Sequence, residues 1–293
     1  MNITNNLQLP TAFYNSVQRE KHNQENCLSA TTLLRGMKDI LLTDRHWNEI
    51  TVDLSKFVWA IWGTAVHSIF EKNTDEHEQA ELSLEYNLDG VKITGKIDNY
   101  NEKDMIISDY KTASVNKVKF NSFDDWQKQG LIYAWLLKRN GKPIKKCRFI
   151  ALLKDHSPRE AMYDKSYPQN PCYIFEFSVS DKNILEIDDF IRQKVEEYKN
   201  YKNLPDDEIP RCSDSEVWKK PDEWAITKKG ASRCVNGGKF KNKAECDKAF
   251  LKYNPKDYYI DVRKGEFTRC NSYCDCKEFC SFWKNLQAKK ESI

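Results

Sequence analysis

The spacing of apolar residues over the first 200 residues predicts a chain of alternating helices and strands. Helical spacing covers 28–42, where Ser29 and Thr31 are possible N-caps, and 54–73. Apolar and polar residues then alternate over 80–88, which predicts a half-buried strand. The further predicted elements are strands over 91–100 and 104–113 joined by the turn NEKD, a helix over 123–141, strands over 145–155 and 172–180, and a helix over 181–201. This order favours an α/β fold with a mixed central sheet flanked by helices.

The pattern weakens after residue 204. The stretch NLPDDEIPRC carries two prolines and an acidic cluster, which predicts a linker. The remaining residues are richer in Lys, Trp and Cys and poorer in periodicity. We therefore predict two domains, 1–204 and 205–293, of which the second needs a staple to be stable.

Composition narrows the class of protein only slightly. The chain has 293 residues, 40% of them hydrophobic, and a net charge of +3. Residues 205–293 carry 19 Lys/Arg against 15 Asp/Glu, an excess too small to identify a nucleic-acid partner by itself. No window has the roughly 18–20 apolar residues of a membrane span, and the N-terminus lacks the order of a signal peptide. We expect a soluble, cytoplasmic protein, in which ten cysteines favour metal binding over disulfides.

Two acids interrupt the strands over 91–113. In a hairpin that turns near Glu102 and Lys103, Asp98 lies opposite Asp109, and Asp109 and Lys111 point to the same side. Two carboxylates held close together favour a shared divalent cation. The alternative is an ordinary solvent-facing strand or an Asp–Lys cross-strand pair.

The neighbouring helices carry residues that fit such a site. His67 lies on the helix before the sheet, and Gln129 and Tyr133 share one face of the helix over 123–141. Each of these has an ordinary structural interpretation when taken alone, as a packed histidine or as polar and core positions of a helix.

Taken in order, these segments resemble the RecB-like branch of the PD-(D/E)XK nuclease superfamily over about residues 28–180. The matching segments are Gly63 to His67, GKID ending at Asp98, DYK from Asp109 to Lys111, and QGLIY from Gln129 to Tyr133. Ile97 stands where the family usually has proline, and Asp109 stands where glutamate is commoner.

The resemblance implies a restriction-endonuclease-like core and a role for each residue. His67, Asp98, Asp109 and the backbone carbonyl of Tyr110 would bind one or two Mg²⁺ or Mn²⁺ ions. Asp98, Asp109 and Lys111 would be catalytic, with Lys111 positioning the attacking water. Gln129 and Tyr133 would hold the nucleic-acid backbone and the lysine. Glu85 on the preceding strand is a candidate outer ligand.

The C-terminal region has Cys270, Cys274, Cys276 and Cys280 within eleven residues. Several RecB-like nucleases carry a [4Fe–4S] cluster there, and the five residues between Cys274 and Cys280 match its spacing. The family's usual first-helix cysteine is absent, since Arg35 to Lys38 occupy that place. We therefore expect Cys212, Cys270, Cys274 and Cys280 to be the ligands and Cys276 to be spare. A Zn²⁺ site is the alternative.

These features together predict a metal-dependent DNA nuclease of phage or bacterial type, an exonuclease in DNA processing or recombination. Its expected partners are DNA, bound in part by the basic and aromatic stretch over 215–250, and a recombination or single-strand-binding protein. Its expected location is the bacterial cytoplasm or an infected host cell. The alternatives are a CRISPR-associated spacer-processing nuclease, a non-catalytic nucleic-acid-binding subunit and a zinc-stapled structural protein.

Overall fold

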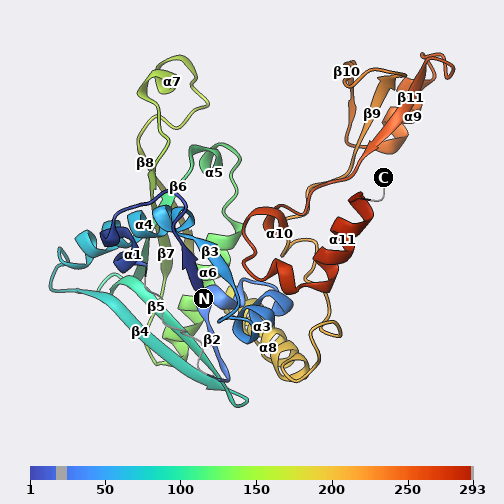
Figure 1. The fold of residues 1–293 in the computed structure, drawn as a ribbon. Helices are drawn as coiled ribbons and strands as arrows, with labels where there is room; N and C mark the ends of the chain where they lie inside the picture. Colours follow the sequence, from blue (N-terminus) through green and yellow to red (C-terminus); the bar gives the residue numbers. More distant parts are fainter. Residues whose placement is uncertain (18–24, 292–293) are drawn as a thin grey trace. The chain divides into compact units, whose positions relative to one another are not determined.

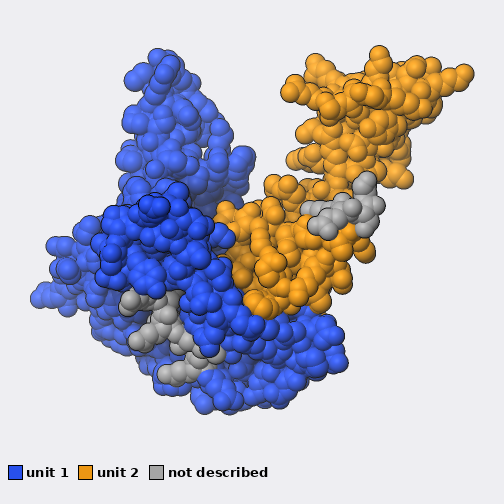
Figure 2. All heavy atoms as spheres, in the orientation of Figure 1, with its two compact units in different colours: residues 1–209 blue, residues 210–293 orange. Residues whose placement is uncertain are grey.

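The computed structural model describes residues 1–17 and 25–291 (Figure 1). The chain divides into two compact units, residues 1–209 and 210–293 (Figure 2). The division lies at Ile209–Pro210, five residues beyond the sequence-predicted one at 204. No helix of the described residues is long and apolar enough to cross a membrane.

The first unit contains the predicted alternation together with several short elements. Its strands are β1 Asn2–Thr4, β2 Cys27–Ser29, β3 Thr51–Asp53, β4 Glu78–Leu88, β5 Val91–Asn101, β6 Ile106–Ala113, β7 Lys146–Leu153 and β8 Cys172–Ser178. Its helices are α1 Thr11–Ser16, α2 Ala30–Leu33, α3 Met37–Arg45, the 3₁₀ helix η1 Leu54–Phe57, α4 Val58–Glu71, α5 Val115–Lys119, α6 Asp124–Arg139, α7 Pro158–Tyr163 and α8 Asp181–Tyr201.

A six-stranded mixed sheet is the centre of this unit. Its order is β2-β5-β6-β7-β8, and β4 pairs with β5 off this path. The pairs β4–β5, β5–β6 and β7–β8 are antiparallel, whereas β2–β5 and β6–β7 are parallel. With helices α4 and α6 packed against it, the sheet confirms the predicted α/β, restriction-endonuclease-like fold class (Figure 1).

Helix α6 is the helix most deeply packed on the sheet. Ten of its residues are buried, with Trp135 among the largest fully buried side chains of the chain. Gly130 permits this close packing, because a Cβ there would lie 3.0–3.2 Å from Phe149, Phe177 and Cys147. Helix α6 therefore brings its polar positions close to the strands that it covers.

The prediction of a single helix over 28–42 is wrong. Residues 27–29 form β2 instead, where Leu28 is buried opposite Ile93 of β5. Ser29 does cap a helix, since its hydroxyl accepts the Thr32 N–H, but α2 is short. Gly36 has an extended backbone and is the N-cap of α3, so the helical pattern is broken there.

The predicted linker around residue 205 is also partly wrong. Ile209 is buried in the first unit, and its carbonyl accepts a hydrogen bond from Lys38. Asp206 pairs with Arg45 and His46 of the α3 end, at 2.6 Å in each case. Residues 205–209 therefore belong to the first unit, and the acidic cluster that suggested a solvated linker anchors the segment to α3.

The second unit has more regular structure than its sequence pattern indicates. It contains β9 Glu223–Lys228, β10 Cys234–Phe240, α9 Lys243–Phe250, β11 Tyr258–Arg263, α10 Thr268–Ser272, the 3₁₀ helix η2 Lys277–Phe279 and α11 Ser281–Glu291. The strands form an antiparallel sheet in the order β10-β9-β11, with α9 packed on it. A separate apolar cluster is formed by Val217, Cys270 and Trp283.

Candidate active site

The two predicted acids lie where strands β5 and β6 part. The ladder between these strands ends at the pair Asn99–Ser108, so Asp98 and Asp109 occupy the next position along each strand. There the Asp98 carboxylate accepts the Tyr110 N–H at 2.8 Å, in place of a backbone ladder bond. The predicted proximity of Asp98 to the Asp109–Lys111 strand is confirmed.

The opposite edge of β5 is irregular at the same position. Buried residues alternate up to Ile97, after which Asn99 and Tyr100 are both buried. The register of β4 with β5 places Glu81 opposite Asp98, but this pair is missing from the ladder and Glu81 has a positive φ of 52°. This irregularity turns two acidic side chains of neighbouring strands toward one point.

His67 reaches this point from helix α4. Its Nδ1 lies 3.3 Å from Oδ1 of Asp98, and its Nε2 lies 2.9 Å from the Tyr110 carbonyl oxygen. The Tyr110 ring packs on Phe70 of the same helix, with ring centroids 4.4 Å apart, and this contact fixes α4 on β6. The hydrogen bond with Asp98 raises the pKa of His67, although burial opposes this shift.

Asp109 is the most buried acid of the site, with 1% of its side chain exposed. Its Oδ2 lies 2.6 Å from Nζ of Lys111, and its Oδ1 accepts a hydrogen bond from the Gln129 amide at 3.4 Å. Burial raises the pKa of Asp109 to about 6, and the charge of Asp98 adds to this while Lys111 opposes it. A divalent cation beside this carboxylate would further favour its ionised form, so the buried acid fits a site that receives one.

Gln129 and Tyr133 have different surroundings from those expected. The Gln129 amide donates to Asp109 and, at 2.9 Å, to the Tyr133 hydroxyl, so it holds the acid and not Lys111. Both side chains are buried. A direct contact of Gln129 with a nucleic-acid backbone does not fit this burial, whereas Tyr133 lines a cavity and its predicted contact with nucleic acid stays a prediction.

Glu81 is the acid of this site that the sequence interpretation missed. One ligand atom each of His67, Glu81 and Asp98 lies within 4.8 Å of the others, and Glu81 also pairs with Lys96. Glu85, the outer ligand suggested from the sequence, is exposed and faces Lys92 at 3.0 Å. The signal that identifies Glu81 is the β4–β5 register, in which it lies opposite Asp98.

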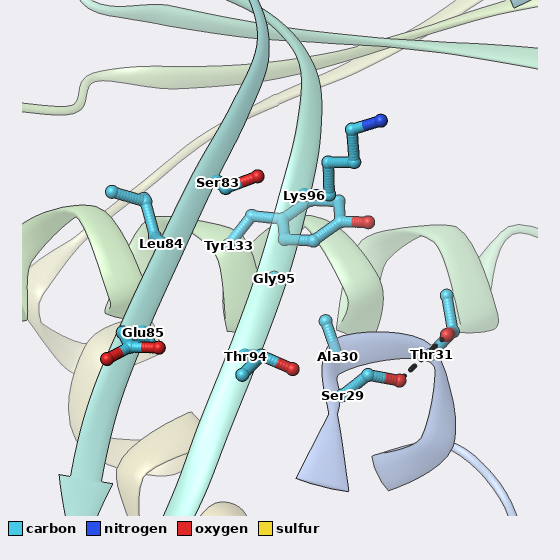
Figure 3. A pocket seen from close by; sticks show the side chains of 10 residues that line it. All are labelled: Ser29, Ala30, Thr31, Ser83, Leu84, Glu85, Thr94, Gly95, Lys96 and Tyr133. Atoms are coloured by element: carbon cyan, nitrogen blue, oxygen red, sulfur yellow. Dashed lines mark hydrogen bonds between the residues drawn. The ribbon is translucent and has the colours of Figure 1, made fainter. Parts of the chain in front are cut away.

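A cavity of about 690 Å³ lies along β4 and β5, and Figure 3 shows the side chains that line it. Its lining comes from the start of α2, from β4, from Thr94 to Lys96 of β5, and from Tyr133. Gly95 leaves room for α6 here, because a Cβ would lie 2.5 Å from Leu136 Cδ1 and 3.1 Å from the Tyr133 ring. The glycine of the GKID segment is therefore required by the packing of α6.

The donor set fits a hard divalent cation. Two carboxylates and an imidazole converge within ligand distance of one another, the Tyr110 carbonyl lies beside them, and Asp109 adjoins them on the next strand. Mg²⁺ and Mn²⁺ prefer carboxylate and carbonyl oxygens, and Mn²⁺ also accepts imidazole. Lys111 supplies a cation that is 22% exposed next to this set.

Three of the four predicted cysteine ligands of the second unit lie at its apolar cluster. Cys212 and Cys280 pack against the cluster that contains Cys270, and Cys274 Sγ lies 3.6 Å from Cys276 Sγ. None of the ten cysteines, all of which lie in the described residues, forms a disulfide. A single tetrahedral ion with metal–sulfur bonds of ~2.3 Å would hold two thiolates ~3.8 Å apart. The contact between Cys274 and Cys276 therefore fits the Zn²⁺ alternative, in which both would bind one ion.

The chain is similar to known nucleases. The family model described as the PD-(D/E)XK nuclease superfamily matches residues 13–281. A search of curated proteins finds no significant match.

Several solved structures overlap with this one at low sequence identity. The structure titled SSO0001 is 18% identical, with a TM-score of 0.43, over 62% of this chain and 82% of the other. An alkaline exonuclease from Laribacter hongkongensis is 12% identical, with a TM-score of 0.38, over 60% and 89%. A phage-related exonuclease from Haemophilus somnus 129PT is 10% identical, with a TM-score of 0.31, over 65% and 78%.

Proposed function

The chain belongs to the PD-(D/E)XK nuclease superfamily, and on this premise we propose that it is a Mg²⁺- or Mn²⁺-dependent DNA exonuclease. The convergence of His67, Glu81 and Asp98 beside the buried Asp109–Lys111 pair carries the proposal. Burying a carboxylate against a lysine costs several kcal/mol per ion before their mutual attraction is counted, which supports a catalytic role for the pair over DNA binding alone.

Five groups would hold the ion: His67, Glu81, Asp98, Asp109 and the Tyr110 carbonyl oxygen. When bound, a divalent cation lowers the pKa of a coordinated water and stabilises the charge that develops on the phosphate. His67 keeps its orientation through the packing of Phe70 on Tyr110. Asp98 is held by the Tyr110 N–H, so the strand backbone fixes the ligand geometry.

Lys111 acts on the attacking water and on the phosphate. Its ammonium is held at 2.6 Å by Asp109 and remains partly exposed, so it can donate to a water or to a phosphate oxygen at the site. Gln129 fixes the Asp109 carboxylate from α6.

Digestion of two matched DNA molecules tests the proposed activity. The purified protein is incubated with an end-labelled linear duplex and a closed circle of the same sequence, with Mg²⁺, Mn²⁺ or EDTA. We expect metal-dependent release of nucleotides from the linear ends, an intact circle, and no activity for Asp109→Asn with an unchanged circular dichroism spectrum. Cleavage of the circle would reject exonuclease action, and intact linear, nicked and single-stranded DNA with both metals would reject the nuclease.

The proposed role of Glu81 as a metal ligand can be tested against Glu85, an acid on the same strand. Glu81→Gln removes a charged ligand, so we expect Mn²⁺ affinity to fall about 10-fold or more in a calorimetric titration. Glu85→Gln changes an exposed acid that faces Lys92, and we expect no change. Equal affinities of the two variants would show that Glu81 is not a ligand.

We also propose that Cys212, Cys270, Cys274 and Cys280 bind a [4Fe–4S] cluster, with Zn²⁺ as the alternative and Cys276 as a competing ligand. The packing of three of these cysteines at one apolar cluster supports a thiolate-bound metal. A brown, iron-containing protein that absorbs at ~400 nm is expected. A colourless anaerobic preparation with stoichiometric zinc would reject the iron–sulfur assignment. The role in DNA processing or recombination, with its partner protein, stays a prediction from the resemblance.

A further inference from the structure

Helix α4 has an exposed aromatic side that its role as the carrier of His67 does not require. Trp59 is 52% exposed and Trp62 is 46% exposed, although tryptophan is usually well buried. Their rings stack on one another, with centroids 5.7 Å apart and an interplanar angle of 29°. Val66 is the one residue of α4 that is buried among those described. The sequence pattern of α4 indicates a core helix, but its tryptophans face solvent.

The helix runs along β6 away from the metal site, and three contacts mark its course. His67 contacts the Tyr110 carbonyl, and a Cβ at Gly63 would lie 3.9 Å from the Thr112 hydroxyl. Trp59 lies at Lys154, whose backbone N–H donates to the Ala113 carbonyl. At 1.5 Å per residue, Trp62 is about 7.5 Å and Trp59 about 12 Å from His67 along the axis. The two rings therefore lie within a few nucleotides' reach of the metal ligands.

A cation accompanies the rings. Nζ of Lys154 lies 3.8 Å from the centroid of the Trp59 ring. The adjacent Asp155 uses its carboxylate to accept bonds from the Ser114 hydroxyl and the Val115 N–H. Stacked aromatic rings next to a lysine are the usual means by which proteins bind single-stranded nucleic acid, since every base has a π-face and every nucleotide a phosphate.

We propose that Trp59 and Trp62 form a platform that stacks on unpaired bases of a DNA strand, with Lys154 contacting its backbone. The inference rests on the proposed function, because the strand on the platform is the one whose phosphate enters the metal site. Two tryptophan side chains have at most about 500 Å² of surface, and because about half of each is exposed they offer about 250 Å². A stable protein interface buries ~1,000 Å² over both partners, or ~500 Å² on each, so nucleobases fit this surface better than a second protein chain.

Binding to two oligonucleotides that differ only in their bases tests the platform. Fluorescence anisotropy is measured in EDTA, which prevents cleavage, with a labelled dT 12-mer and an abasic 12-mer of equal charge. We expect the full-length protein to prefer the dT 12-mer, and Trp59→Ala and Trp62→Ala each to weaken its binding about 5- to 100-fold. Binding of the abasic oligomer should not change, because its phosphates are unaffected.

Ile69→Ala is the matched control, since Ile69 is 60% exposed on the same helix and has no ring. It should bind both oligomers as the unchanged protein does. Tryptophan variants that keep the preference for dT would overturn the platform, as would variants that alter only the sedimentation coefficient, which would indicate self-association. A protein that shows the base preference but never cleaves DNA would reject the proposed nuclease and leave the platform standing.

Discussion

The two units hold their reactive side chains by different physical means. In residues 1–209 the site acids lie on strands whose positions are fixed by a core that includes Trp135, Tyr100 and Phe149. In residues 210–293, three of the seven buried hydrophobic residues described are cysteines, namely Cys246, Cys270 and Cys276. The first unit therefore brings its proposed metal ligands together by packing, whereas the packing of the second unit itself includes cysteines that are potential metal ligands. We expect metal removal to inactivate the first unit and to unfold the second.

Removal of the proposed thiolate-bound metal should give the largest effect. Structural thiolate sites contribute on the order of 10 kcal/mol of apparent binding free energy, which is folding free energy for a small unit. We expect the double variant Cys270→Ser, Cys280→Ser to lose proteolytic protection over residues 210–293 while residues 1–209 stay resistant. Cys172→Ser, at an exposed cysteine of β8, is the control. Undiminished protection of β9 to β11 in the double variant would show that the folding of the second unit does not depend on a thiolate-bound metal.

Loss of Lys111 should inactivate the first unit without unfolding it. We expect Lys111→Ala to reduce the rate of DNA hydrolysis about 10³-fold, or roughly 4 kcal/mol of transition-state stabilisation. Lys92→Ala on β5 is the control, because Lys92 pairs with Glu85 at the exposed side of the β4–β5 pair. Rates are compared at saturating Mg²⁺, with melting curves for each variant. Equal rates of DNA hydrolysis for the two variants would show that Lys111 does not take part in catalysis.

A smaller effect on stability is expected where the packing of α6 on β5 is disturbed next to the candidate active site. Gly95→Ala places a Cβ 2.5 Å from Leu136 and 3.1 Å from Tyr133, so α6 or its side chains must shift. Overpacking of this kind costs about 1–3 kcal/mol of the free energy of unfolding. Gly63→Ala is the matched control, since its nearest neighbour is 3.9 Å away and alanine favours a helix by up to ~1 kcal/mol. Urea unfolding gives the free energy of unfolding of each variant. A Gly95→Ala protein as stable as the Gly63→Ala protein would show that the close packing of α6 at Gly95 does not contribute to stability.

The smallest effect concerns the attachment of residues 205–209 to α3. Burial lowers the pKa of His46, but its hydrogen bonds and ion pairs with Asp206 and Glu49 together raise it above 6.5. Stability from this raised pKa is complete below pH 6.5 and is lost as the pH rises through the folded-state pKa. We expect a loss of up to ~1 kcal/mol between about pH 6 and 9.

His46→Asn isolates that contribution. The difference in unfolding free energy between the unchanged protein and His46→Asn should shrink toward high pH. The contribution of His67 cancels in this difference, because His67 titrates in both proteins. A difference that is constant with pH would show that the ion pair with Asp206 does not contribute.

Sequence patterns predicted the parts of the site that depend on strand parity. Asp109 and Lys111 are two residues apart and contact each other, and Tyr110 points away onto Phe70, as alternation requires. Glu81 was not predictable in this way, because its position depends on the pairing of β4 with β5 and on an irregular backbone at Glu81 itself. The strands of the second unit were missed because they are short and interrupted by lysine and glycine, as in residues 234–240.

The parting of β5 and β6 also bears on the order of folding. Glu81, Asp98 and Asp109 lie on three consecutive antiparallel strands, so contacts of short sequence separation gather the acids. The parallel pairing of β6 with β7 must wait for α6, whose Gln129 closes over Asp109. We therefore expect the folding chain to assemble its acidic hairpins first and to seal the most buried carboxylate afterwards, so that protection of the Asp109 amide from hydrogen exchange develops later than that of β4.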